Sequence, residues 1–78
     1  MLPAKIPVTE VLQDPIFVNG EARQVAPGTT LAVFLETLGI RGRIAVEIDG
    51  EIVPRSSHAT RLLQPGERVE IVHAIGGG

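Results

Sequence analysis

The sequence of 78 residues contains no cysteine, no tryptophan and no tyrosine. Without cysteine, the chain can form neither a disulfide nor a thiolate metal site, and it has no cysteine nucleophile. The two histidines, His58 and His73, do not have the HxxxH or HExxH spacing of a zinc site. The core must therefore come from aliphatic residues, and a hydrophobic content of 44% supplies enough of them for one small domain.

Basic and aromatic residues are also scarce. Seven basic residues face nine acidic ones, for a net charge of −2, and Phe17 and Phe34 are the only rings. Without a basic stripe or a stacking surface, we expect no nucleic-acid partner. We also expect no membrane association, because every apolar run is too short to span a bilayer. Prolines 3, 7 and 15 interrupt the start of the chain, which therefore lacks the apolar stretch of a signal peptide, and we expect a cytoplasmic location.

Proline and glycine divide the sequence into short elements. The three prolines of residues 1–15 predict a loosely held N-terminal arm. After it, Asn19-Gly20 and Asp49-Gly50 are hairpin signals between short apolar segments. The first hairpin would pair residues 16–18 with 22–26, and the second would pair 44–48 with 51–53. Residues 55–64 read as a long surface connection, and residues 69–75 as the last and most apolar strand.

Residues 29–40 predict one helix of about two to three turns. Thr29 or Thr30 can cap its start, and Gly39 can end it. An apolar stripe at helical spacing would pack on a sheet, and it consists of Leu31, Phe34, Leu35 and Leu38.

This order of elements predicts an α+β fold of the ubiquitin-like β-grasp type over residues 16–75. We expect a mixed sheet of about four to five strands, with one helix across one face and the first and last strands parallel in the middle. Strand alternation turns Phe17 and Val72 away from the helix on neighbouring strands, where they would form an apolar partner surface. The alternative is that the N-terminal arm covers Phe17. Arg55 is a weaker candidate for a partner contact.

No arrangement of side chains in the sequence indicates an enzyme. The carboxylates around Asp49 sit at a hairpin, where solvated charge is the usual explanation. Ser56, Ser57 and His58 are adjacent, but a catalytic triad is a spatial arrangement that also needs an orienting acid and an oxyanion hole. No phosphate-binding lysine motif is present, since the single lysine is Lys5. We expect no catalytic residue, no metal and no cofactor bound by the chain itself.

The sequence closes on Gly76-Gly77-Gly78, which we expect to be a flexible tail. A terminal carboxylate becomes reactive once another enzyme activates it as an acyl-adenylate. Glycines without a Cβ can thread a narrow channel that larger residues would block. These features favour a substrate passed between enzymes, with Gly78 as the reactive residue and Gly76 and Gly77 as the threading segment. The alternative is a frayed end of an interaction domain.

The chain from residue 16 to 78 resembles the ThiS family, the bacterial sulfur carriers of thiamine biosynthesis. The similar segments are "VNGE" at 18–21, "PGTTLAVFLETLGI" at 27–40, "IAVEIDGEIVPRSSH" at 44–58 and "LLQPGERVEIVHAIGGG" at 62–78. The combination of "VPR" with the "IGGG" ending is the most specific part of this likeness. The arm at residues 1–15 lies outside the resemblance.

The resemblance implies a mechanism with three partners. A ThiF-like adenylating enzyme would use ATP to activate the Gly78 carboxylate, and a persulfide donor would convert it to a thiocarboxylate. A ThiG-like thiazole synthase would then accept the sulfur. Two alternatives share the fold: a sulfur carrier of the molybdopterin-synthase small-subunit type, and a ubiquitin-like protein modifier. Polymers of such a modifier are disfavoured, because Lys5 is the single lysine.

Overall fold

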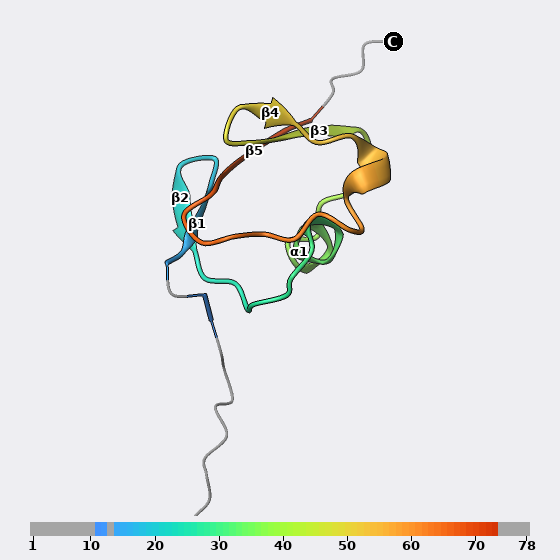
Figure 1. Cartoon of the computed structure of the whole chain (residues 1–78). Helices are drawn as coiled ribbons and strands as arrows, with labels where there is room; N and C mark the ends of the chain where they lie inside the picture. Colours follow the sequence, from blue (N-terminus) through green and yellow to red (C-terminus); the bar gives the residue numbers. More distant parts are fainter. Residues whose placement is uncertain (1–10, 13, 74–78) are drawn as a thin grey trace, which may run out of the picture.

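The computed structural model describes residues 11, 12 and 14–73, and this part of the chain forms one sheet with a helix against it (Figure 1). Within it no helix has the length and apolar character of a membrane span. The elements in chain order are β1 (Ile16–Val18), β2 (Glu21–Arg23), α1 (Leu31–Thr37), β3 (Ile44–Ile48), β4 (Glu51–Ile52), the 3-10 helix η1 (Arg55–Ser57) and β5 (Arg68–His73).

Both predicted hairpins are confirmed. Asn19-Gly20 joins β1 to β2, and Asp49-Gly50 joins β3 to β4. All four turn residues have positive φ, between 48° and 88°, which is the backbone of the turn that matches strand twist. Because each turn has two residues, it sets the register of the strand that follows.

Strand β5 lies in the centre of the sheet, whose order is β2-β1-β5-β3-β4. It pairs with β1 in parallel and with β3 in antiparallel orientation (Figure 1). The predicted parallel pair in the middle of a mixed sheet is therefore confirmed. With α1 across one face, the arrangement is the β-grasp fold that the element order predicts.

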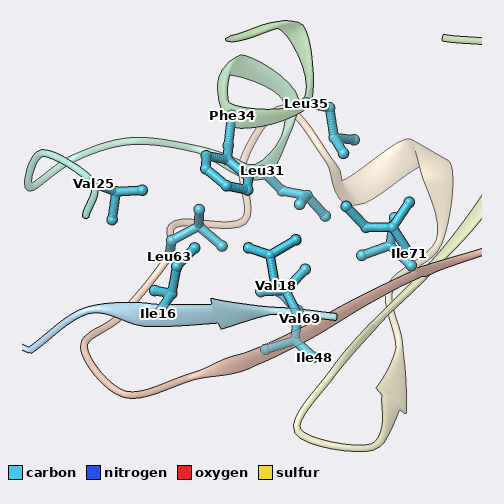
Figure 2. Packing of buried hydrophobic residues seen from close by; sticks show 11 residues of the cluster. Ile16, Val18, Val25, Leu31, Phe34, Leu35, Ile48, Leu63, Val69 and Ile71 are labelled. Atoms are coloured by element: carbon cyan, nitrogen blue, oxygen red, sulfur yellow. The ribbon is translucent and has the colours of Figure 1, made fainter. Parts of the chain in front are cut away.

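The core lies between α1 and one face of the sheet (Figure 2). Alternate residues of the three inner strands point to the helix, as period-two geometry requires. These buried residues are Ile16, Val18, Val46, Ile48, Val69 and Ile71. They meet three residues of the predicted stripe, Leu31, Phe34 and Leu35, whereas Leu38 at the end of the helix is only partly buried.

The N–H groups at the start of α1 all find acceptors. Thr30 is the N-cap, and its Oγ1 accepts a hydrogen bond from the Val33 N–H at 3.2 Å. The N–H groups of Leu31 and Ala32 donate to the carbonyls of residues 61 and 58, at 2.8 and 2.9 Å. The segment that follows η1 thus completes the cap of a helix some thirty residues earlier in the chain.

The prediction that residues 55–64 form a long surface connection is confirmed in part: most of these residues are exposed, but the segment does not lie wholly at the surface. This segment contains η1, and it buries Leu63 to 2% exposure and His58 to 9%. The His58 ring lies with Nε2 3.2 Å from the Val53 carbonyl oxygen, so the histidine is used inside the fold. The physical reason is that this segment closes one end of the core while it satisfies the helix N–H groups.

Three strands and the helix differ in extent from the prediction: α1 spans Leu31–Thr37 rather than residues 29–40, and β4 ends at Ile52 rather than at residue 53. Strand β2 stops at Arg23, and Val25 turns into the core, where its carbonyl accepts a hydrogen bond from the Leu12 N–H at 2.8 Å. Leu12, from the predicted arm, packs against the core. Strand β5 starts at Arg68, and positions 74 and 75 of the predicted strand lie outside the described residues.

Because Leu63 is buried and the adjacent Leu62 is exposed, we predict that their substitution by alanine will differ in its effect on stability. Leu63→Ala will lower the free energy of unfolding by about 2–5 kcal/mol, because it leaves a cavity in the core. Leu62→Ala, at a side chain that is 43% exposed, will cost about 1 kcal/mol or less. Urea unfolding of both variants measures this difference, and equal losses would contradict the placement of Leu63.

Candidate functional site

Strand β5 leads into the glycine tail, the predicted reactive segment. Gly76, Gly77 and Gly78 lie outside the described residues. The structure instead describes the base from which the tail continues, which ends at His73 of β5. The candidate site is therefore the surface around the last residues of this strand.

The side chain of Asn19 takes the place of a strand residue beside β5. Its Oδ1 accepts a hydrogen bond from the Ile71 N–H at 2.8 Å, and its Nδ2 donates to the Ile71 carbonyl at 3.3 Å. The Asn19 backbone N–H donates to the Val69 carbonyl at 2.8 Å. One residue of the first hairpin turn thus extends the pairing of β5 beyond the end of β1.

The structure does not bring Phe17 and Val72 together, so the predicted single apolar patch is wrong. Both lie on neighbouring strands and point away from α1, as predicted, but Phe17 pairs with Arg68, whose guanidinium lies 5.9 Å from the ring centroid. Val72 lies four positions further along β5, opposite Ala45. Glu70 occupies the outward position between them. Alternation predicts the facing of these residues, whereas only the register gives their separation.

A smaller apolar group surrounds Val72, and it includes a residue that the sequence analysis missed. Ile52 is 66% exposed and Val72 is 59% exposed. Ile52 pairs with Glu47, and the next outward position on β3 is Ala45, the partner of Val72. We call Val72, Ala45 and Ile52 the open-face patch. The sequence could have predicted the position of Ile52. The two-residue turn at Asp49-Gly50 sets the register between β3 and β4, which places Ile52 opposite Glu47.

Two acidic residues lie beside the open-face patch. Glu47 of β3 is directly opposite Glu70 of β5, on the face that α1 does not cover. Neither forms an ion pair with another described residue. Carboxylates in directly opposite positions repel each other, so this pair does not stabilise the sheet. It can instead attract a basic side chain from a molecule that covers this face.

Arg55 has a partner within the fold. Its Nη2 donates to the Gly42 carbonyl at 2.9 Å, which joins η1 to the loop before β3. Gly42 lies two residues before Ile44, the residue opposite His73. Arg55 therefore lies at the same end of the sheet as the base of the tail. Its predicted contact with a partner protein stays a prediction.

The buried polar residues form hydrogen bonds within the fold. The Glu67 carboxylate, with 9% of the residue exposed, accepts hydrogen bonds from Arg61 Nη2 at 2.7 Å and from the Gln64 N–H at 2.8 Å. Among the residues described, no three His, Asp or Glu side chains gather into a group that could hold a metal ion. The candidate site is thus a surface at the base of the tail to which another molecule can bind.

Comparison with known proteins gives relatives of the same size and of a larger size. The model of the ThiS family matches residues 16–78. The sulfur carrier protein ThiS of Escherichia coli is 36% identical over 64 residues, which cover 81% of this chain and 97% of that protein. A thiazole synthase of Paramagnetospirillum magneticum is 42% identical over 64 residues. The chain spans 20% of the length of that synthase.

A solved structure agrees with the fold. The crystal structure of a thiamine biosynthesis protein (ThiS) from Geobacter metallireducens superposes with a TM-score of 0.72 at 26% sequence identity. The match covers 82% of this chain and 99% of that one. The whole of a ThiS domain, including its sheet and its helix, is therefore present in this chain.

The double contact of Asn19 with Ile71 predicts a graded loss of stability. Asn19→Gly keeps the positive φ of the turn but removes both side-chain hydrogen bonds, which will cost about 1–2 kcal/mol. Asn19→Ala will cost about 1 kcal/mol more, because a Cβ disfavours this backbone. Chemical denaturation measures the free energies, and hydrogen exchange at the Ile71 amide reports the lost bond. An unchanged exchange rate in Asn19→Gly would contradict the assignment.

Proposed function

Because this chain belongs to the ThiS family, we propose that it is a sulfur carrier for thiazole formation in thiamine biosynthesis. The observation that carries the proposal is the family match over residues 16–78, which includes both the β-grasp domain and the glycine tail. The proposal is also supported by the name of the Escherichia coli relative, a sulfur carrier protein that aligns over 97% of its length.

The proposed chemistry takes place at the carboxylate of Gly78. One carboxylate oxygen attacks the α-phosphorus of ATP on a ThiF-like enzyme, and pyrophosphate leaves. The terminal sulfur of a persulfide then attacks the carbonyl carbon of the acyl-adenylate, and AMP leaves. A thiol reduces the resulting acyl disulfide, which releases the thiocarboxylate and a disulfide. The ATP binds to the partner and not to the carrier, which contributes no catalytic residue.

Glycine at positions 76–78 suits this role for a steric reason. A residue without a Cβ lets the backbone approach the walls of an active site closely, where its N–H and carbonyl groups can form hydrogen bonds. Strand β5, paired on both sides, supplies a rigid base for the tail. Since the activation consumes ATP, we place the carrier in the cytoplasm.

The sulfur acceptor in this proposal is a ThiG-like thiazole synthase. A fifth of the length of the Paramagnetospirillum magneticum thiazole synthase is similar to this chain, and the same holds for a thiazole synthase of Magnetococcus marinus. A synthase that carries a similar domain within its own chain supports direct transfer between the two proteins. The open-face patch and Phe17 are the candidate contacts for these partners.

Removal of the last two glycines tests the reactive tail. The full chain will support ATP–pyrophosphate exchange by the adenylating enzyme of its host, and a chain that lacks Gly77 and Gly78 will not, because the carboxylate no longer reaches the nucleotide. The intact mass of the protein isolated from its host will show one oxygen replaced by sulfur at Gly78. Exchange that persists in the shortened chain would overturn the proposal. Isolation as isopeptide conjugates on other proteins would indicate a modifier instead.

Substitutions on the open face test the partner surface. Val72→Ser and Phe17→Ser will each weaken binding to the adenylating enzyme about tenfold, because apolar side chains at protein interfaces carry much of the affinity. In both variants the loss of affinity will be larger than the fall in melting temperature accounts for. Val33→Ser is the matched control. Val33 is 52% exposed, and it lies on α1, which covers the other face of the sheet. Titration calorimetry measures the affinities, and an equal loss in Val33→Ser would contradict this surface.

A further inference from the structure

The pairing of β5 stops on one edge before the strand ends. Successive residues of a strand direct their N–H and carbonyl groups to opposite edges. The carbonyl of residue 68 accepts from Asp49, on the β3 side, whereas residues 67, 69 and 71 bond to Phe17 and Asn19, on the β1 side. The N–H and carbonyl of His73 therefore point to the β1 side. There the chain has already turned away, and no other described residue pairs with His73 on that edge.

A hollow of about 460 Å³ lies next to this open edge. Four apolar residues line it, Val18, Leu38, Ile40 and Ile71. The polar residues of its lining are Asn19 and His73 at the open edge and Glu21 and Arg23 of β2. The hollow exists because α1 ends at Thr37 and Gly39 then turns the chain away with a φ of 73°. The helix therefore leaves this end of the sheet uncovered on the side from which the tail continues.

We propose that the adenylating enzyme adds an extended segment to β5 at this edge, with an apolar side chain in the hollow. The inference rests on the proposed function and names how the partner holds the carrier. The added segment would lie beside β5 just beyond Asn19, in line with β1. Its backbone would pair there with the backbone of His73. Side chains of that segment on the α1 side would enter the hollow, because Val18 and Ile71 already point that way.

The chemistry of the site favours a strand over a small ligand. Asn19 shows that this edge accepts both a donor and an acceptor at the spacing of a backbone, since its side chain pairs with both groups of Ile71. The next pair of edge groups, on His73, has the same alternation. The Glu21–Arg23 pair at 3.6 Å places both charges in the lining of the hollow, where a carboxylate of the partner can displace Glu21 from Arg23.

Two substitutions at one position separate the backbone from the side chain. His73→Pro removes the N–H that faces the open edge, without the loss of a hydrogen bond to β3. His73→Ala removes the imidazole and keeps the N–H. We expect His73→Ala to bind the adenylating enzyme within about threefold of the unchanged chain, and His73→Pro to bind at least about tenfold more weakly. Both variants will retain the unfolding midpoint within a few degrees, because His73 is exposed.

Amide hydrogen exchange of the unchanged chain gives a second, independent measurement. The His73 N–H will exchange rapidly in the free protein and will be protected in the complex, and the methyl signals of Leu38 and Ile40 will shift. An unprotected His73 amide in a saturated complex, or equal affinity of the proline and alanine variants, would overturn strand addition while adenylation stands. Failure of the enzyme to adenylate the unchanged chain would overturn the proposed function and this inference together.

Discussion

The pairing of β5 on both of its edges is the constraint on which the rest of the structure depends. Only a central strand can hold β1 in parallel and β3 in antiparallel orientation at once. Its inward residues, Val69 and Ile71, then lie beneath α1, and Val69 has no exposed surface. The remaining elements complete this arrangement: β2 and β4 extend the sheet outward, and the segment after η1 closes the core and caps the helix.

Several independent contacts meet at one end of the sheet. Asn19 holds one edge of β5, and Ile44 pairs with the other edge at His73. Arg55 fixes the loop before β3 through Gly42. Three parts of the chain that are distant in sequence thus position the base of the tail. In the proposed function such a base gives specificity, because a partner can recognise the domain and the tail together.

Local chemistry in the sequence predicts the turns, the helix and the strand facing. Asn19-Gly20 and Asp49-Gly50 need positive φ, and the stripe from Leu31 to Leu35 has helical spacing, so each signal is contained in a few neighbouring residues. The parallel pair in the centre follows from the order of the elements. These features do not depend on distant contacts, which explains why one sequence suffices to predict them.

The missed features depend on contacts between distant segments. Leu63 is buried because residues 55–64 have to satisfy the N–H groups of α1, and a pattern within that segment gives no sign of it. The separation of Phe17 from Val72 depends on the register between β1 and β5. The position of Ile52 could have been predicted from the sequence, because a two-residue turn sets the register of β4. The proposed role of Gly78 stays a prediction, and it rests on the chemistry of a terminal carboxylate and on the family, not on the described geometry.

The direction of β5 also determines how the domain bears mechanical load. In the proposed function a partner holds the tail, and a pull along β5 would run parallel or antiparallel to the neighbours β1 and β3. Their hydrogen bonds are then loaded together in shear, whereas a strand peeled sideways would lose its bonds one at a time. A pull along β5 is therefore opposed by its hydrogen bonds on both edges at once.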